Sequence, residues 1–590
     1  GTCGFACNGG THACGSVCAR DDLPETCGTR CEPCPVPANA RATCEGGACG
    51  WECLGGFVRA GDRCRALPRP LWPPSGSTVA NRRPAMRWSI PDDADPMAAD
   101  TVVEFCADRG CAAPTMTLPA GMGRGAPAMD LPRGVVWWRV RAGGLSSASW
   151  PMVVGGPENA ASPRPTAAFG AVPDFNGDGF GDTVFGAPFA SPPIVLQYPG
   201  ARGGVGLLPP EAINAPDPSL RFGAALAAGD FNGDGRVDLA VGAPTSTGSA
   251  SRGAVYVFFA GPAGIGTGPD VTLDDPVGGV SAFAEVVIAA GDLDADGYGD
   301  LAVGSSRARN QGAVYVYRGT ATGPSSTPSW TLSGPAMNLA LFGGALAAGD
   351  LDADGDSDLV VGASGVSDFT GRAYVYSGSP TGLPAVATLT LQRAEGGQFG
   401  AAVAVPGDLD GDGYADLAVG APAVDDGTGI VLAYRGGAMG VSVTTDVLRR
   451  GEAPRGDFGG ALVSAGDMNN DGRYDLLVGA GRLNDFTGRA YLIRGDGTDT
   501  LGLGATAIAG PMVTAAYFGG VLGAGRDIDG DGFDDVLISA ERNRSFAGGA
   551  FIYYGSVAGV GRSTEIPSAI MGGRFGYALA ARACVRPFWM

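Results

Sequence analysis

Short apolar runs separated by glycine-rich turns recur through the last two thirds of the chain and predict β-strands rather than helices. Each unit has one strand after a Phe-Gly pair, as in ALAAG before Asp230, and a second after an acidic loop, as in DLAVGAP. A third is a Gly-led alternating strand, such as GAVYVF from Gly253. A fourth, weaker strand is expected before the next Phe-Gly pair. The pattern predicts four antiparallel strands per unit.

The unit is an internal repeat. The segment from Phe222 to Pro244, FGAALAAGDFNGDGRVDLAVGAP, recurs from Phe342, Phe399, Phe458 and Phe518. The acidic loops begin at 174, 230, 292, 350, 408, 467 and 527, in steps of 56 to 62 residues. Seven such units indicate a closed ring or a solenoid, and four strands per unit favour the blades of a β-propeller. The last strand, RFGYALA, lacks an acidic loop, and we expect it to pair with the first unit and close the ring.

The Phe-Gly and Gly-Ala-Pro sequences that flank each unit resemble the FG-GAP repeat family, the propeller of integrin α-subunits, over about 420 residues. The resemblance implies a mainly β fold with a seven-bladed β-propeller over residues 166–590. It also implies calcium loops on one face, between the first and second strands of each blade. The connections between the second and third strands would then build the opposite face.

Each acidic loop carries oxygen side chains at positions 1, 3, 5 and 9 of the pattern DxDxDGxxD, with Asn at position 3 in three loops. An EF-hand needs a bidentate Glu at position 12, but position 12 here is apolar, as in Phe185, Val241 and Val419. The loop is therefore a β-hairpin loop closed by the ninth residue. No arginine pattern offsets these carboxylates consistently, and Ca²⁺ tolerates their irregular oxygen coordination better than Mg²⁺. Solvated Asp/Gly turns are the alternative.

We therefore expect about seven Ca²⁺ ions, one per unit, held by four side chains and, as the resemblance implies, by the backbone carbonyl at position 7. The expected ligands are Asp174, Asn176, Asp178, Phe180, Asp182, Asp230, Asn232, Asp234, Arg236, Asp238, Asp292, Asp294, Asp296, Tyr298, Asp300, Asp350, Asp352, Asp354, Asp356, Asp358, Asp408, Asp410, Asp412, Tyr414, Asp416, Asp467, Asn469, Asp471, Arg473, Asp475, Asp527, Asp529, Asp531, Phe533 and Asp535.

The formal net charge of −20 disfavours nucleic-acid binding, which needs clustered cations, and bound Ca²⁺ would account for most of this acidity. All 40 basic residues are arginine, and the chain has one histidine. Schiff-base lysines, Ser-His-Asp triads and multi-histidine metal sites are therefore excluded. No run reaches the roughly 18 apolar residues that a membrane span requires. The chain begins with Gly1, without a leader, so we expect a processed product or a fragment.

Residues 1–65 form a Cys-rich disulfide module, which holds eleven of the 14 cysteines and indicates an oxidising compartment. Cys31 and Cys34 form a lone CxxC, for which a redox or zinc role is the alternative to a structural disulfide. Residues 66–156 contain short strands at 84–88, 101–106 and 135–141, and resemble a fibronectin type III β-sandwich. A disulfide between Cys106 and Cys111 is plausible. Residues 157–165 are a linker, and Cys584 either pairs with the first module or stays a free thiol.

On the opposite face of the propeller we expect partner contacts from Arg307, Arg309, Arg482, Arg542, Arg544 and Phe546. The leading hypothesis is a non-enzymatic, secreted or surface-displayed bacterial binding or adhesion protein that is stabilised by calcium. Its partner would be an extracellular protein or glycan. One alternative is a polysaccharide-acting enzyme that uses Asp425, Asp426 and Glu541. Another is a structural subunit of an extracellular assembly or filament, joined through the Cys-rich end.

Overall fold

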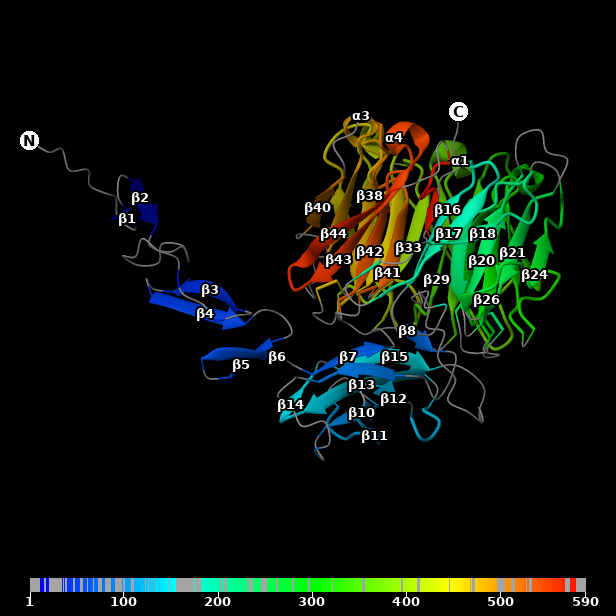
Figure 1. The fold of residues 1–590 in the computed structure, drawn as a ribbon. Helices are drawn as coiled ribbons and strands as arrows, with labels where there is room; N and C mark the ends of the chain where they lie inside the picture. Colours follow the sequence, from blue (N-terminus) through cyan, green and yellow to red (C-terminus); the bar gives the residue numbers. More distant parts are fainter. Residues whose placement is uncertain are drawn as a thin grey trace, which may run out of the picture.

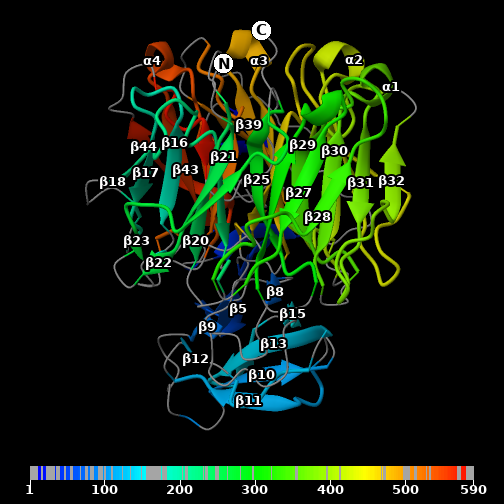
Figure 2. The same cartoon turned by 90° about the vertical axis from the view of Figure 1, so that its right-hand side faces the viewer.

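Figures 1 and 2 show a computed structural model of the protein. Most of its β-structure lies in two parts, residues 69–154 and the C-terminal part from residue 183 onward. The structure describes residues 11–14, 17–20, 34, 37, 40–45, 48–53, 57–60, 62–66, 68–72, 77–79, 86–90, 98, 101–107, 111–121, 124–125, 127–132, 134–147, 149–154, 175, 182–201, 204–205, 210–229, 231–232, 237–245, 252–261, 264–278, 281–294, 298–320, 322–352, 356–393, 396–410, 414–444, 446–466, 468–469, 473–495, 505–510, 515–526, 528–529, 533–567 and 573–579.

The C-terminal part contains seven four-stranded antiparallel sheets among the described residues. The first consists of β16 (Thr183–Ala187), β17 (Ile194–Tyr198), β18 (Glu211–Asn214) and the C-terminal β45 (Ala578–Leu579). The second consists of β19 (Ala225–Gly229), β20 (Asp238–Ala243), β21 (Ala254–Phe258) and β24 (Val271–Asp274), with the small hairpin β22 (Ala260–Gly261) and β23 (Gly264–Ile265) beside it. The third consists of β25 (Phe283–Gly291), β26 (Asp300–Ser305), β27 (Ala313–Tyr317) and β28 (Trp330–Ser333).

The other four sheets repeat this strand order. The fourth consists of β29 (Phe342–Gly349), β30 (Asp358–Ala363), β31 (Arg372–Tyr376) and β32 (Leu389–Gln392). The fifth consists of β33 (Ala402–Gly407), β34 (Asp416–Ala421), β35 (Ile430–Tyr434) and β36 (Asp446–Arg450). The sixth consists of β37 (Ala461–Gly466), β38 (Asp475–Ala480), β39 (Arg489–Ile493) and β40 (Ala505–Ala509), and the seventh of β41 (Leu522–Arg526), β42 (Asp535–Ser539), β43 (Gly549–Ser556) and β44 (Gly559–Pro567). The expected four strands per unit are confirmed, and the fold is mainly β and consistent with a β-propeller.

Glycines at fixed positions let neighbouring sheets touch through their backbones. Gly420 is the second-last residue of β34 in the fifth sheet, and Gly459 precedes the first strand of the sixth with φ of +79°. A Cβ atom on Gly420 would lie 2.0 Å from the carbonyl oxygen of Gly459. The same close approach joins Gly186 to Gly223 and Gly479 to Gly519. The Phe-Gly and Gly-Ala-Pro sequences are therefore the two sides of one sheet-to-sheet contact.

The C-terminal strand closes this series of sheets. Ala578 and Leu579 in β45 pair antiparallel with Gly186 and Phe185 in β16. One buried cluster joins side chains of the first and seventh sheets, including Phe185, Ile552 and Phe575. The expected pairing of the last strand with the first unit is confirmed.

Residues 69–154 form two sheets around a shared core. One sheet has the order β11 (Met116–Pro119), β10 (Val102–Cys106), β13 (Gly134–Ala142), β15 (Trp150–Val154), β8 (Ser77–Val79), with β14 (Leu145–Ser146) beside β13. The other has the order β12 (Arg124–Gly125), β9 (Met86–Ser89), β7 (Arg69–Trp72). Trp88 from the smaller sheet packs with Phe105 and Trp138 from the larger one. Strands β9, β10 and β13 cover the three expected segments to within a few residues.

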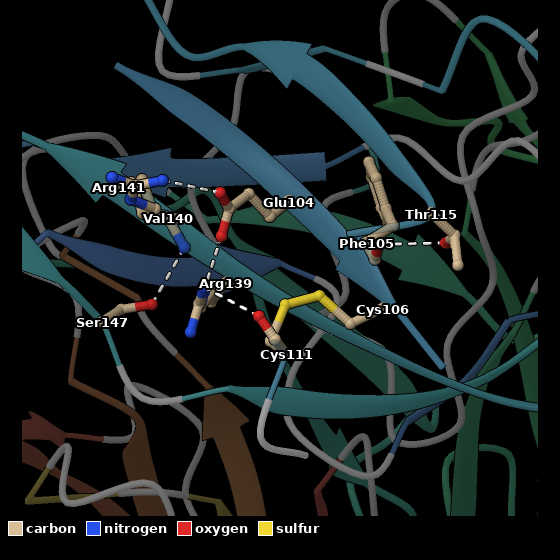
Figure 3. Close-up of a disulfide and its surroundings, with 9 residues drawn as sticks. All are labelled: Glu104, Phe105, Cys106, Cys111, Thr115, Arg139, Val140, Arg141 and Ser147. Atoms are coloured by element: carbon tan, nitrogen blue, oxygen red, sulfur yellow. Dashed lines mark hydrogen bonds and ion pairs between the residues drawn. A yellow bond between two sulfur atoms is a disulfide. The ribbon is translucent and has the colours of Figure 1, made fainter. Parts of the chain in front are cut away.

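Polar contacts and one disulfide stabilise the larger sheet (Figure 3). The buried carboxylate of Glu104 forms ion pairs with Arg139 at 2.7 Å and with Arg141 at 3.0 Å. Cys106 and Cys111 are joined by a disulfide, as expected from the sequence. The two ion pairs connect β10 to β13, and the disulfide joins the end of β10 to the segment that follows it.

The described residues of the Cys-rich part form three short hairpins. They are formed by β1 (Thr11–Cys14) with β2 (Val17–Arg20), β3 (Ala40–Glu45) with β4 (Ala48–Cys53), and β5 (Phe57–Ala60) with β6 (Arg63–Ala66). Cys34 of the lone CxxC is bonded to Cys49, which supports a structural role for that cysteine. Cys31 and Cys584 lie outside the described residues. In the described part of the chain, no helix is long and apolar enough to span a bilayer.

Candidate functional site

In the second to seventh sheets the acidic loop connects the first and second strands, and in the first sheet it precedes β16. Among the described residues, three groups of aspartates bring one oxygen of each member within 4.8 Å of the others. These groups are Asp292, Asp294 and Asp300; Asp350, Asp352 and Asp358; and Asp408, Asp410 and Asp416. Most of these side chains are buried, and all their donor atoms are oxygen. Such a donor set fits a hard divalent cation such as Ca²⁺.

The ninth residue of each loop also has a structural role, which the sequence did not reveal. In the fifth sheet, Asp416 Oδ2 accepts the backbone N–H of Leu409 at 2.9 Å, and Oδ1 accepts that of Gly436 at 3.2 Å. The same pair of contacts, to a residue seven positions earlier and one 18 to 22 positions later, occurs at all seven aspartates. They are Asp182, Asp238, Asp300, Asp358, Asp416, Asp475 and Asp535. Each aspartate thus connects its loop to the end of the third strand.

Burial and mutual repulsion disfavour the ionised carboxylates of the metal-free loops. Burial raises the pKa of Asp416 to about 8, and Asp410 adds to the rise, while backbone N–H donors from Leu409 and Gly436 oppose it. Burial likewise raises the pKa of Asp300 well above its ordinary value, with further contributions from Asp294 and Asp292. A bound dication would remove this penalty because it favours the ionised form of every carboxylate around it.

Arginines pair with the third residue of three loops. Arg318 Nε lies 2.6 Å from Asp294 Oδ2, and Arg562 Nη2 lies 2.7 Å from Asp529 Oδ2. Arg435 Nη1 lies 3.4 Å from Asp410 Oδ2. Arginine therefore offsets the third residue of at least three loops, although the sequence shows no pattern that is consistent over all seven. For two of these pairs the sequence shows a shared pattern: Tyr-Arg-Gly at 317–319 and 434–436, in which the tyrosine is the last residue of the third strand and the arginine follows it.

Backbone hydrogen bonds connect consecutive loops. The carbonyl oxygen of Asp292 accepts the N–H of Ser357 in the next loop at 3.0 Å. The carbonyl oxygen of Asp408 accepts the N–H of Tyr474 at 3.1 Å. In both pairs the donor residue lies directly before the ninth aspartate of the next loop, so neighbouring loops are joined at this position.

The structure describes some of the expected ligands and leaves others outside. The fifth residue of every loop, and Asp174, Asn176, Phe180, Asp230, Arg236, Asp467 and Asp527, lie outside the described residues. The ninth residue starts the second strand in six of the sheets, as in Asp238 of β20, and a strand follows each loop where an EF-hand would have a helix. The β-hairpin interpretation is therefore confirmed for the loops of the second to seventh sheets.

At the opposite end of the sheets, short helical turns connect the second and third strands. These are η1 (Ala308–Asn310), α1 (Val366–Phe369), α2 (Val424–Gly427), α3 (Leu483–Phe486) and α4 (Asn543–Phe546). Helices α1 to α4 lie at the end farthest from the two-sheet part (Figures 1 and 2). The candidate contact residues that the structure describes, including Arg309, Arg482 and Phe546, belong to these connections.

The candidate contact residues on these connections differ in exposure and in their neighbours. Arg309 is exposed and Arg307 is half-buried. Arg482 lies 3.8 Å from Asp457, and Arg542 packs over the ring of Tyr517. Phe546 is 48% exposed, which is unusual for a phenylalanine, whereas the side chain of Arg544 lies outside the described residues. These positions form a mixed aromatic and cationic surface.

The acidic residues considered for an enzyme are not gathered in one place. Asp425 and Asp426 belong to α2 of the fifth sheet and pair with Arg450 and Arg455. Glu541 follows β42 of the seventh sheet, is buried and lies beside Arg542. The two groups thus lie on connections of different sheets and face arginines.

Comparison with known proteins agrees with the repeat. The FG-GAP repeat model matches residues 222–258, 399–434 and 458–493, and the FG-GAP-like repeat model matches residues 292–361. The chain contains FG-GAP repeats. Each matched segment lies within the seven sheets and includes an acidic loop.

Curated relatives of the chain include integrin α-subunits. The chain is 32% identical to integrin alpha-4 of Xenopus laevis over 213 residues, which cover 34% of the chain and 20% of that protein. It is 36% identical to integrin alpha-7 of Homo sapiens over 182 residues, which cover 30% of the chain and 15% of that protein. The chain is 34% identical to integrin alpha-V of Gallus gallus over 214 residues, which cover 33% of the chain and 19% of that protein. The chain thus spans a fifth or less of the length of these relatives, and the similarity supports an integrin-like FG-GAP propeller.

Proposed function

We propose that the seven sheets are the blades of a seven-bladed β-propeller over residues 166–590, and that each acidic loop holds one Ca²⁺ ion. The convergence of buried carboxylates in three loops supports the sites, and the repeat extends the proposal to the other four. Positions 1, 3, 5 and 9 and the carbonyl at position 7 would hold the ion. Bound calcium would neutralise the loops and hold the first and second strands of each blade together.

The proposed domains before the propeller are a Cys-rich module at 1–65, a fibronectin type III-like sandwich at 66–156 and a linker at 157–165. The shared core around Trp88, Phe105 and Trp138 supports the sandwich. These domains would present the propeller at a distance from the surface or assembly to which the chain is attached. The disulfides Cys34–Cys49 and Cys106–Cys111 fit a secreted or cell-surface location, because such bonds persist in oxidising compartments.

The function that the site supports best is binding or adhesion to an extracellular protein or glycan through the propeller face formed by η1 and α1 to α4. The observation that carries this proposal is the repeated exposure of one phenylalanine at this face, Phe369, Phe486 and Phe546, each between 38% and 48% exposed. Connections on a rigid scaffold are common binding surfaces. The integrin relatives support a binding role in place of catalysis.

A solid-phase assay tests this function. The full chain is measured against purified extracellular matrix proteins and a glycan array, in calcium and in excess EDTA. We expect binding to one class of partner in calcium, and its loss with the triple variant Phe369→Ala, Phe486→Ala and Phe546→Ala. Binding by a fragment of residues 1–156, or binding that the triple variant leaves unchanged, would contradict the proposal.

A further inference from the structure

Each acidic loop from the third to the sixth sheet is bonded to the next sheet as well as to its own. The main contact is the second loop residue, which lies between the expected calcium ligands at positions 1 and 3. Its N–H donates to the ninth aspartate of the same loop, as Leu351 does to Asp358 Oδ2 at 2.9 Å. Its side chain is at most 1% exposed in all seven loops, at Phe175, Phe231, Leu293, Leu351, Leu409, Met468 and Ile528.

The carbonyl oxygen of the second loop residue is bonded to the neighbouring sheet. In the fourth loop, the oxygen of Leu351 accepts the N–H of Gly437 at 3.2 Å. Gly437 lies shortly after β35, the third strand of the fifth sheet. The same contact occurs in two further pairs, at 3.2 and 2.9 Å: Leu293 with Ser379, and Met468 with Ser556. The second loop residue thus joins the ninth aspartate of its own loop to the third strand of the next sheet.

Two adjacent residues therefore hold two different loops. Gly436 donates its N–H to Asp416 Oδ1 of the fifth loop at 3.2 Å, and Gly437 donates to Leu351 of the fourth. A Cβ atom on Gly436 would lie 2.8 Å from the carbonyl oxygen of Leu351, so the two sheets approach closely here. The fourth and seventh sheets have the same pair of donors. We call these pairs connectors: residues 378–379, 436–437 and 555–556.

Two loops that share a connector also share the free-energy cost of ordering it. When the fifth loop holds its ion, Asp416 is fixed and, through its hydrogen bond, so is Gly436. The N–H of Gly437 is then already in place for Leu351, so the fourth loop loses less conformational entropy on binding its own ion. Coupling between two binding sites is equal in both directions, so the fourth loop must favour ion binding in the fifth as well.

We propose that the acidic loops of the third to seventh sheets bind calcium cooperatively, because backbone hydrogen bonds join each of these loops to the next sheet. Connectors join the third loop to the fourth sheet, the fourth to the fifth and the sixth to the seventh. The bond between Asp408 and Tyr474 joins the fifth loop to the sixth. These sheets then become ordered together over a narrow range of calcium concentration, and the partner surface at their other end is presented above that threshold. The inference rests on the proposed calcium sites and specifies how they depend on one another.

The number of ions bound per chain, measured by native mass spectrometry, tests the proposal. The full chain is equilibrated with calcium at a concentration that fills half of its sites. Cooperative binding predicts two main populations, one of chains with few ions and one of chains with most sites filled. A single population centred on half occupancy would overturn the proposal, because it is the result expected of independent sites. A chain that binds no calcium at all would instead refute the proposed calcium sites.

A matched pair of variants at Gly437 tests the connector itself. Gly437→Pro removes the N–H that Leu351 accepts, whereas Gly437→Ala keeps it. An added Cβ at Gly437 has the carbonyl oxygen of Gly440 within 4 Å, at 3.8 Å, so alanine fits. Hydrogen exchange of the peptide that covers residues 350–358 is followed as calcium is added. In Gly437→Pro we expect the calcium concentration at half-protection to rise about fivefold or more, the lower end of typical coupling, and in Gly437→Ala to stay at the wild-type value. Equal values in the two variants would contradict the role of the connector.

Removing the ion from one loop shows whether its neighbour depends on it. The double variant Asp408→Asn and Asp412→Asn takes two expected ligands from the fifth loop. We expect half-protection of residues 350–358 to need about fivefold more calcium or more, and the same two changes made in Gly437→Pro to add no further increase. An unchanged fourth loop would overturn the proposal while the calcium sites stand. Wild-type protection of the first sheet in saturating calcium establishes that the variants are folded.

Discussion

At the scale of single residues, the ninth aspartate of three loops accepts backbone hydrogen bonds and also belongs to a group of convergent carboxylates that could hold a metal ion. Both oxygens of Asp416 accept backbone N–H groups, yet the same carboxylate belongs to one of the convergent acidic groups. The sequence identified this aspartate as a metal ligand from its spacing. It could not reveal the second role, because the partner Gly436 is 20 residues away and meets Asp416 only after the third strand has folded back.

The arginine beside the third loop residue gives a matched test. Arg318 pairs with Asp294, whereas Arg494 follows the third strand of its sheet in the same way, but the acidic loop of that sheet has Asn469 at position 3. Without Arg318, nothing of this pair opposes the repulsion between carboxylates in the metal-free loop, whereas in the calcium-bound loop the ion itself would offset that repulsion. In Arg318→Gln we therefore expect a lower melting temperature in EDTA and a larger rise on adding calcium, by several degrees. Arg494→Gln should show a smaller change, and equal shifts in the two variants would contradict this role.

The raised pKa of Asp416, about 8, predicts how pH affects the metal-free protein. An aspartate in the unfolded chain ionises near pH 4, so between about pH 4 and 8 the unfolded state has lost a proton that the folded state retains. Stability contributed by the protonated group is complete below pH 4 and is lost as the pH rises toward 8. The melting temperature in EDTA should therefore fall as the pH rises from about 4 to 8, and it should fall less in Asp416→Asn. A rise in stability over this range would contradict the prediction.

At the scale of elements, the contact between neighbouring sheets depends on glycine. An added Cβ at Gly420 would lie 2.0 Å from the carbonyl oxygen of Gly459. Neither atom can avoid the other by a side-chain rotation, because the Cβ is fixed to the backbone and the oxygen belongs to it. Gly420→Ala should destabilise the protein by about 3 kcal/mol, as overpacking in a rigid core does. Gly268→Ala, with no atom within 4 Å of its added Cβ, is the control and should leave the denaturant midpoint unchanged. Equal midpoints for both variants would disprove the close contact.

The strands were predictable because the repeat shows their pattern several times over. ALAAG, DLAVGA and AVYVF each became the expected strand, β19, β20 and β21. The fourth strand was harder to place, since β24 has a single buried residue among four and varies between units. The stacking of Phe546, Arg574 and Phe189 was not predictable, because it joins residues from both ends of the repeat region.

At the scale of the whole molecule, closure depends on a two-residue strand. Phe575 and Leu579 are fully buried between the first and seventh sheets. The double variant Phe575→Ala and Leu579→Ala should lose about 5 kcal/mol of stability or more, given the usual cost of removing large buried side chains. Proteolysis should then cleave first near residues 185–200, where β16 loses its partner. Cleavage that starts in the fifth sheet would show that the junction between the first and seventh sheets is not the least stable part of the ring.

The central claim is that calcium in seven loops holds the propeller together, and a direct measurement of bound metal tests it. The full chain is dialysed against calcium, its metal content is determined by mass spectrometry, and its melting is recorded with and without excess EDTA. The account predicts about seven Ca²⁺ ions per chain, one for each loop, and a large fall in melting temperature on chelation, because a ligand bound only by the folded state stabilises it. A chain that retains no calcium, or melts at the same temperature in EDTA, would contradict the account.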